Sequence, residues 1–210
     1  MEQIMKKIKT HARRKFYDFN SFTFQYPRIL KYRILSDCYS ITGKPKIVQP
    51  TLFCGAGRIL FAKDVVLGTR YSPSFYSGYN FLEVRTDNSS IEFAHGVWTN
   101  NNLVIMSNGS GVYIGENTLI GYNVEIFDCD FHETDPLKRK YGNPGSEKVI
   151  ISENVWIGSN VKILKGVTIG RNSIISNGSI VTNPIPENVI AGGIPARVIK
   201  PLTPSFHETN

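Results

Sequence analysis

Eleven residues from Ile126 to Pro136 gather side chains that could do chemistry together. They read IFDCDFHETDP and contain one histidine, one cysteine, one glutamate and three aspartates. Such a set could bind a metal ion, could pair a cysteine nucleophile with a base, or could surround a single histidine that acts as a general base. These residues alone do not distinguish the three chemistries, so the flanking sequence has to.

A six-residue period runs through the sequence on both sides of this cluster. Six residues match neither the helical period of about 3.6 nor the alternation of a long strand. The period predicts very short strands joined by turns, with one branched apolar side chain per strand pointing inward. Three such strands per coil, stacked coil on coil, make a parallel β-helix with the shape of a triangular prism. The inward positions are Ile91, Val97, Leu103, Ile114, Ile120, Ile126, Ile151, Ile157, Ile163, Ile169, Ile175 and Val181, with a second series at Val112, Thr118, Val124, Val155, Val161, Val167, Ser173 and Ser179.

The period also divides the chain. It stops between Asp128 and Val149, so residues 128–149 should form a loop that leaves the prism. Prolines and a Gly-Gly pair within residues 184–200 predict a cap over the open end of the coils. We therefore expect a basic aromatic N-terminal segment over residues 1–50, a β-helix domain over residues 51–200 and a tail over residues 201–210.

Positive charge is concentrated at the N-terminus. Residues 1–46 carry eleven Lys and Arg against three Asp and Glu, a net +8, and the whole chain carries +7. This segment could touch an anionic membrane surface. We favour a different interpretation, a cap whose aromatic residues pack against the main body, because aromatic side chains tend to be buried. Those residues are Phe16, Tyr17, Phe19, Phe22 and Phe24.

Composition excludes several other classes. No apolar run approaches the roughly 20 residues needed to span a bilayer, and no secretory signal is apparent. The three cysteines are an odd number without pairwise spacing, which is typical of a reducing compartment, so we expect a cytoplasmic protein. They form no CxxC pair, which argues against a zinc-thiolate site. No nucleic-acid-binding module accompanies the basic segment, so we expect no nucleic-acid partner.

Two stretches resemble the hexapeptide-repeat acyltransferases, and within them the galactoside, maltose and capsular-sugar O-acetyltransferase branch. The specific one is VWIGSNVKILKGVTIGRNSIISNGSIVTNPIPENVIAGGIPARVI over residues 155–199, and a looser one covers residues 99–132. The first fifty residues do not resemble the family's usual N-terminal helical segment. The resemblance implies an all-β, left-handed parallel β-helix, whereas the general preference for right-handed crossovers would predict the other hand. It also implies a homotrimer that uses acetyl-CoA and a saccharide acceptor, with each active site in the groove between two prisms.

The resemblance assigns roles to individual residues. His132 matches the family's catalytic histidine, and Asn100 and Asn102 match polar positions near the acceptor. The cofactor positions are Trp156, Ser159, Asn177, Thr182, Asn183, Arg197 and Lys200. This chain departs from its relatives at Ser176–Ser179 and at Thr182-Asn183, so Lys162, Lys165 or Arg171 could replace some contacts to the CoA phosphates. The aromatic stretch YSPSFYSGYNF, residues 71–81, could support a sugar ring or fill a trimer interface.

The opening cluster can now be interpreted. The chain has only four histidines, so three converging imidazoles are hard to supply, and we expect no metal. Cys129 is expected to pack as a small buried residue. His132 remains as a general base for a sugar hydroxyl, oriented by Asp128, Asp130 or Glu133. We therefore predict an acetyl-CoA-dependent O-acetyltransferase, with an N-acetyltransferase of a nucleotide-linked amino sugar and a non-catalytic β-helical scaffold as alternatives.

Overall fold

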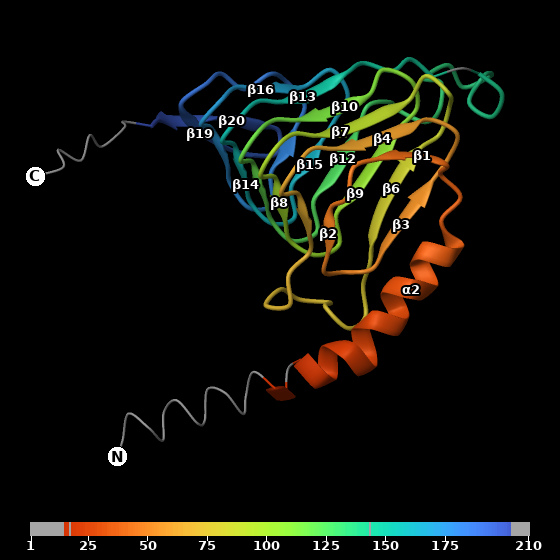
Figure 1. The fold of residues 1–210 in the computed structure, drawn as a ribbon. Coiled ribbons are helices and arrows are strands. Elements are labelled where there is room, and N and C mark those ends of the chain that lie inside the picture. Colours follow the sequence, from red (N-terminus) through yellow and green to blue (C-terminus); the bar gives the residue numbers. More distant parts are fainter. Residues whose placement is uncertain (1–14, 17, 143, 203–210) are drawn as a thin grey trace, which may run out of the picture.

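Three parallel sheets form the three faces of a triangular prism in the computed structural model, which describes residues 15–16, 18–142 and 144–202 (Figure 1). The first face contains β1 (Ser40–Thr42), β4 (Arg58–Phe61), β7 (Ser90–Phe93), β10 (Val112–Ile114), β13 (Val149–Ile151) and β16 (Thr168–Ile169). The second contains β2 (Lys46–Ile47), β5 (Val66–Leu67), β8 (Trp98–Thr99), β11 (Leu119–Ile120), β14 (Trp156–Ile157), β17 (Ile174–Ile175), β19 (Val189–Gly193) and β20 (Ala196–Pro201). The third contains β3 (Thr51–Cys54), β6 (Asn80–Val84), β9 (Val104–Ser107), β12 (Glu125–Phe127), β15 (Lys162–Ile163) and β18 (Ile180–Val181).

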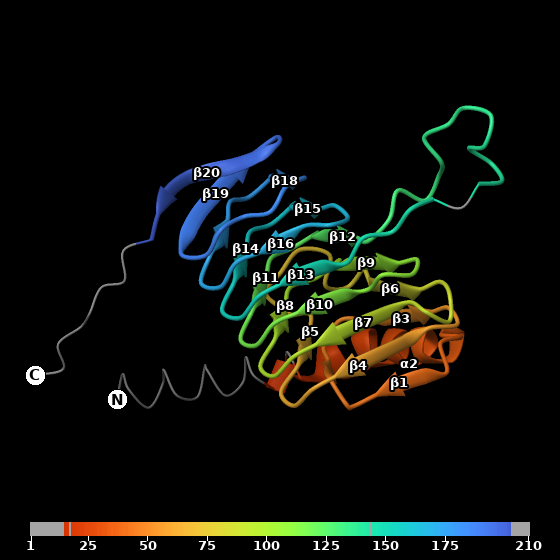
Figure 2. The same ribbon diagram turned by 90° about the horizontal axis from the view of Figure 1, so that it is seen from above.

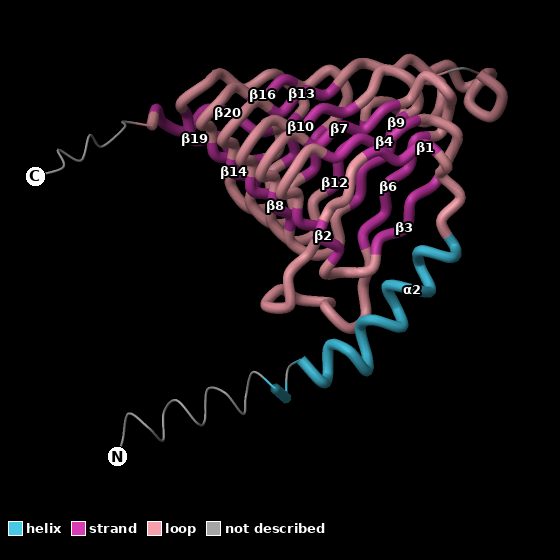
Figure 3. Tube along the Cα trace, viewed as in Figure 1, coloured by secondary structure: helices cyan, strands magenta, loops and turns pink. Residues whose placement is uncertain are grey.

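Each repeat of six residues supplies one short strand and one turn on one face of the prism. Each strand pairs with the strand one coil away, so that Ile114 lies beside Ile151 and Ile126 beside Ile163. Both series of inward positions predicted from the sequence are buried. The side chains therefore stack into one continuous core, and short strands alternate with turns along every coil (Figure 3).

Tight turns at the corners depend on residues that tolerate positive φ. Asn154, Asn160 and Asn172 have φ between 55° and 60°, as their turn-like positions in the repeat predict. Asn154 Nδ2 donates to Asn172 Oδ1 at 2.9 Å, and Asn172 Nδ2 donates to Asn188 Oδ1 at 2.7 Å. Asparagines of successive coils thus bond along one corner of the prism.

The prism begins earlier than expected. β1 pairs with β4 and β2 pairs with β5, so the first coil starts at Ser40 rather than at residue 51. This coil contains ITGKPKIV, in which glycine, proline and lysines interrupt the apolar period. Its backbone groups nevertheless join the ladder, and Lys46 N donates to Val65 O at 2.8 Å.

A helix precedes the first coil and lies against β3, at the starting end of the prism (Figure 2). A π-helical turn η1 (Ser21–Gln25) leads directly into α2 (Tyr26–Leu35). The expectation that its phenylalanines pack against the body is wrong: Phe16, Phe19, Phe22 and Phe24 are 59–70% exposed, and Tyr17 lies outside the described residues. The helix contacts the prism through polar side chains instead, as described below.

The expected loop and cap are both present. The chain leaves the prism after β12 and returns at β13, and Figure 2 shows the loop projecting away from the coils. At the other end of the stack, β19 pairs with β17, and β20 folds back antiparallel on β19. Leu202 N still bonds Asn188 O, while residues 203–210 lie outside the described part. Within the described part, no helix is long and apolar enough to cross a membrane.

One pair of neighbouring residues tests the inward core. Ile151 is fully buried, whereas Ile150 in the same strand points outward. Ile151→Ala should lower the free energy of unfolding by about 2–5 kcal/mol because it removes buried methyl groups and leaves a cavity. Ile150→Ala should cost about 1 kcal/mol or less. Denaturant unfolding of both variants measures the difference, and equal losses would contradict the prism register.

Candidate functional site

The candidate residues lie on two different edges of the prism. Every coil runs from the first face to the second and then to the third. We call the edge from the third face back to the first the loop edge, because residues 128–148 leave there. His132, Thr182 and Asn183 lie at or beyond the loop edge, while Asn100, Asn102, Ser159 and Asn177 lie on the edge between the second and third faces.

Asp128 fixes the point where the loop leaves the prism. Its carboxylate is buried and accepts three hydrogen bonds at 2.7 Å, from Ser107 Oγ, Asn108 N and Gly111 N. Its carbonyl accepts a further bond from Glu147 N, where the chain returns. These donors occupy both carboxylate oxygens, so Asp128 holds the base of the loop and does not orient His132.

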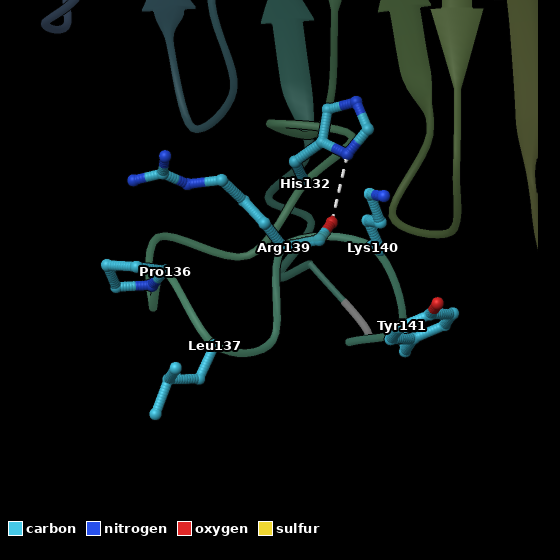
Figure 4. Close-up of a pocket in the computed structure, with 6 residues that line it drawn as sticks. All are labelled: His132, Pro136, Leu137, Arg139, Lys140 and Tyr141. Carbon is cyan, nitrogen blue, oxygen red and sulfur yellow. Dashed lines mark hydrogen bonds between the residues drawn. The ribbon is translucent and has the colours of Figure 1, made fainter.

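His132 stands exposed within the loop. Its Nδ1 lies 3.1 Å from the carbonyl oxygen of Arg139, as Figure 4 shows. A carbonyl only accepts hydrogen bonds, so this contact assigns the proton to Nδ1 and leaves the lone pair of a neutral ring on Nε2. The expectation that a carboxylate orients the ring is wrong for this structure, because a backbone carbonyl occupies that place. The ring borders a hollow of about 450 Å³ formed with Pro136, Leu137, Arg139, Lys140 and Tyr141.

Two neighbours of His132 have structural roles. Asp130 Oδ2 lies 2.6 Å from Lys165 Nζ, and this hydrogen bond raises the pKa of Lys165. Cys129 is buried, and its backbone forms an isolated antiparallel β-bridge with Ser146 across the base of the loop. Burial raises the pKa of the Cys129 thiol, which disfavours the reactive thiolate. The expectation that Cys129 serves packing agrees with this position.

The second–third edge brings polar side chains of successive coils together. Asn102 N donates to Gln49 Oε1 at 2.7 Å, and its side chain contacts Gln49 Nε2 and the Tyr122 hydroxyl. Asn177 Oδ1 accepts from Ser159 N at 2.8 Å. Asn102 also borders a hollow of about 460 Å³ that includes Tyr79 and Phe81 from the aromatic stretch. The side chain of Asn100 is partly exposed on the same edge.

Sequence reasoning missed Asn101, which lies between the two asparagines it named. Asn101 is fully buried, its Oδ1 accepts from Thr69 N, and its Nδ2 donates to Pro73 O at 2.9 Å. It therefore holds the irregular segment between β5 and β6. The TNNNL stretch itself carries no mark that separates this buried asparagine from its neighbours, because all three are the same residue type.

The remaining cofactor candidates are exposed. Trp156 projects from the second face, where Leu119 and Ile174 flank it on adjacent strands. Arg197 and Lys200 project from β20 in the cap, and Thr182 and Asn183 follow β18. The structure therefore brings Trp156, Ser159 and Asn177 onto the second face and its border with the third. It does not bring them to His132 within one chain.

The three alternative phosphate contacts already have partners. Lys162 pairs with Glu125, and Lys165 pairs with Asp130. Arg171 Nε lies 2.7 Å from Glu187 Oε2, and this contact raises the pKa of Arg171. The idea that these cations replace missing phosphate contacts is thus disfavoured. By contrast, the structure records no ion pair for Arg197 or Lys200 among its described residues.

A hollow of about 630 Å³ lies between the N-terminal helix and the second face. Sequence reasoning did not predict it, since its aromatic residues come from separate parts of the chain. Its lining includes Phe22, Tyr26, Tyr71, Phe75 and Trp98, with Lys46 and Arg70 as cations. As for metals, no group of three or more His, Cys, Asp and Glu side chains suited to an ion occurs among the described residues.

Asp128 and Asp130 form a matched pair for testing the base of the loop. Asp128→Asn places an amide nitrogen against buried N–H or O–H donors, and should lower the free energy of unfolding by about 2 kcal/mol or more. Asp130→Asn removes the same charge from an exposed ion pair and should cost less than about 1 kcal/mol. Thermal and denaturant unfolding compare the two. If Asp130→Asn proved the more harmful, the anchoring role of Asp128 would be wrong.

Known proteins resemble both the repeat and the fold. Residues 148–183 match the family described as bacterial transferase hexapeptide (six repeats). The galactoside O-acetyltransferase of Lactococcus lactis is 36% identical over 137 residues, which make up 65% of this chain and 62% of the relative. That of Escherichia coli is 45% identical over 114 residues, or 54% of this chain and 55% of the relative. The chain thus spans less than two thirds of the length of these curated relatives.

A solved structure agrees with these similarities. A galactoside acetyltransferase in complex with coenzyme A superposes with a TM-score of 0.53 at 35% identity, over 78% of this chain and 65% of that one. This likeness covers the stacked parallel coils described above and agrees with the left-handed parallel β-helix expected from the resemblance. The six-residue repeat and the three-faced prism are thus similar to those of hexapeptide-repeat transferases, and the similarity in sequence extends to the galactoside O-acetyltransferases named above.

Proposed function

We propose that the chain transfers an acetyl group from acetyl-CoA to a saccharide hydroxyl, with His132 as the general base. The observation that carries this proposal is the contact between His132 Nδ1 and Arg139 O, which in the neutral ring leaves the lone pair on Nε2 of this exposed histidine. The relatives named galactoside O-acetyltransferase and the solved relative with coenzyme A support the choice of acceptor and donor.

The chemistry needs one base and no covalent enzyme intermediate. Nε2 of His132 takes the proton of the sugar hydroxyl as the hydroxyl oxygen attacks the thioester carbonyl. The tetrahedral intermediate then expels the CoA thiolate, and the imidazolium gives its proton to this leaving group, which yields free CoA and the acetylated sugar. Backbone N–H groups or a polar side chain near the thioester would stabilise the oxyanion. Cys129 has no part in this scheme, in agreement with its burial.

The two-edge arrangement supports a site shared between copies of the chain. His132 lies beyond the loop edge, whereas the proposed acceptor residues Asn100 and Asn102 lie on the second–third edge. One prism cannot bring its own two edges together, but a neighbouring prism in a homotrimer can bring its second–third edge to the loop. We propose that each site combines His132 of one copy with the asparagine edge of the next.

The donor would lie along the coils of residues 155–183. Trp156 offers an exposed aromatic surface, while Ser159, Asn177, Thr182 and Asn183 supply polar groups near the edges. Arg197 and Lys200 supply cations on the cap, suited to the phosphates of CoA. Each of these assignments can be tested separately from the catalytic step.

Substitution of His132 tests the base. His132→Ala should lower turnover on a hydroxy-sugar by about 10²-fold or more, while CoA binding persists. His95→Ala serves as the matched control, because His95 is exposed and contacts Asp64 at a different corner of the prism. Transfer rates to paired hydroxy- and amino-sugars measure the effect. Near-full activity of His132→Ala on the hydroxy-sugar would remove this histidine from the mechanism. Wild-type transfer to the amino-sugar that largely survives His132→Ala would favour an amine acceptor, because an amine is more nucleophilic and needs a base less.

Two exposed tryptophans test the donor site. Trp156 and Trp98 lie one above the other on the second face, separated by Leu119. Acetyl-CoA should raise the melting temperature, by mass action on the folded state. Trp156→Ala should weaken CoA binding by about tenfold, as expected for loss of one aromatic contact, whereas Trp98→Ala should leave it unchanged. Calorimetric titration of both variants decides. Absence of any heat or stabilisation with the wild-type chain would favour the scaffold alternative.

A further inference from the structure

The N-terminal helix has the reverse of the polarity expected for a surface helix in water. Such helices normally bury an apolar stripe and expose polar residues. Here α2 buries no residue, and the buried residue of η1 is Gln25. Large apolar side chains on this helix are 47–74% exposed. Phe22 and Tyr26 border the hollow against the second face, and the others are Phe16, Phe19, Phe24, Leu30, Ile34 and Leu35.

Polar contacts hold the helix in this orientation. Arg28 donates to Phe75 O at 2.9 Å and to Gly78 O at 2.6 Å, and Gln25 Nε2 donates to Val48 O. Tyr32 packs on Tyr79 with ring centroids 4.7 Å apart. The inward side is thus fixed to the prism by specific partners. These contacts determine the orientation of the helix, and they keep its apolar side facing away from the prism.

Basic residues accompany the apolar side. Lys15, Lys31 and Arg33 are exposed on the helix, which has Asp18 as its acidic residue among those described. The sequence before the helix adds more Lys and Arg, which gives residues 1–46 their net charge of +8. Figure 1 shows the helix along one side of the prism, with no other described element over its outer side.

From these observations we propose that the exposed side of the helix over residues 15–16 and 18–35 docks on the surface of an anionic membrane. Phenylalanine, leucine and isoleucine would enter the boundary between headgroups and acyl chains, and the Lys and Arg residues would meet the lipid phosphates and carboxylates. A second copy of the chain fits this side less well. Two such helices facing each other would bring their own basic residues together, and residues 47–210 total −1, which offers little opposite charge.

The sequence alone favours a helix packed on the main body, because aromatic side chains tend to be buried, yet the structure leaves these side chains exposed. The surface of an anionic bilayer would bury the apolar side chains and would also attract the basic residues of the helix. The inference does not depend on acetyl transfer, since docking can be measured without acceptor or acetyl-CoA.

Flotation of the full chain with vesicles tests the proposal. The wild-type chain should float with vesicles of phosphatidylcholine plus phosphatidylserine, should bind pure phosphatidylcholine far less, and should be released by salt. Lys31→Glu with Arg33→Glu should weaken binding by about tenfold or more. Leu30→Asn with Ile34→Asn should weaken it comparably, because it removes the inserted apolar groups.

Matched controls separate docking from folding and from general charge. Lys63→Glu with Lys148→Glu makes the same change in net charge elsewhere on the exposed surface, and Leu119→Asn removes an exposed leucine from the second face. Both controls should float as the wild type does, and all variants should keep its melting temperature. No flotation of the wild type with the anionic vesicles would overturn the proposal. So would helix variants that bind vesicles normally but change the mass of the assembly in sedimentation, because a second copy would then cover this side.

Discussion

Register between successive coils is the constraint on which the rest of this structure depends. A slip of one residue in a strand would turn every inward isoleucine to the outside. The coils also approach so closely that a Cβ at Gly121 would lie 2.6 Å from backbone atoms of Gly158 and Ser159. The pairing of Ile114 with Ile151 shows that register survives the long loop between them. The prism therefore holds both ends of the loop that carries His132 in fixed positions.

Hydrogen bonds and ion pairs then fix the residues of the loop that leaves the prism. The Asp128 carboxylate collects donors from β9 and from the turn before β10, and so seats the first residues of the loop. The Arg139 carbonyl, seven residues beyond His132, sets the tautomer of the ring. The cluster thus contains one buried anchor, Asp128, two surface aspartates paired with lysines, Asp130 and Asp135, and one exposed histidine.

Much of the fold could be predicted from the sequence because the same pattern, one inward side chain every six residues, recurs many times along the chain. Twelve inward positions from Ile91 to Val181 are all buried, and the asparagines at the turns adopt the positive φ expected of them. The first coil was missed because ITGKPKIV contains too few apolar residues to show the period. The orienting group of His132 was missed because any residue has a carbonyl, so no side chain marks it. The exposure of the N-terminal phenylalanines could not be predicted, because the tendency of aromatic side chains to be buried does not say whether this chain or another surface buries them.

The central claim is that His132 of one copy meets the donor thioester and the acceptor edge of another. A structure of the assembled protein with acetyl-CoA bound measures this most directly. The account predicts Nε2 of His132 within hydrogen-bonding reach of an acceptor hydroxyl beside the thioester carbonyl. It also predicts that Asn100 and Asn102 of a neighbouring copy line the same groove. A thioester that ends far from every copy's His132, or a monomer that binds acetyl-CoA in a complete site of its own, would contradict it.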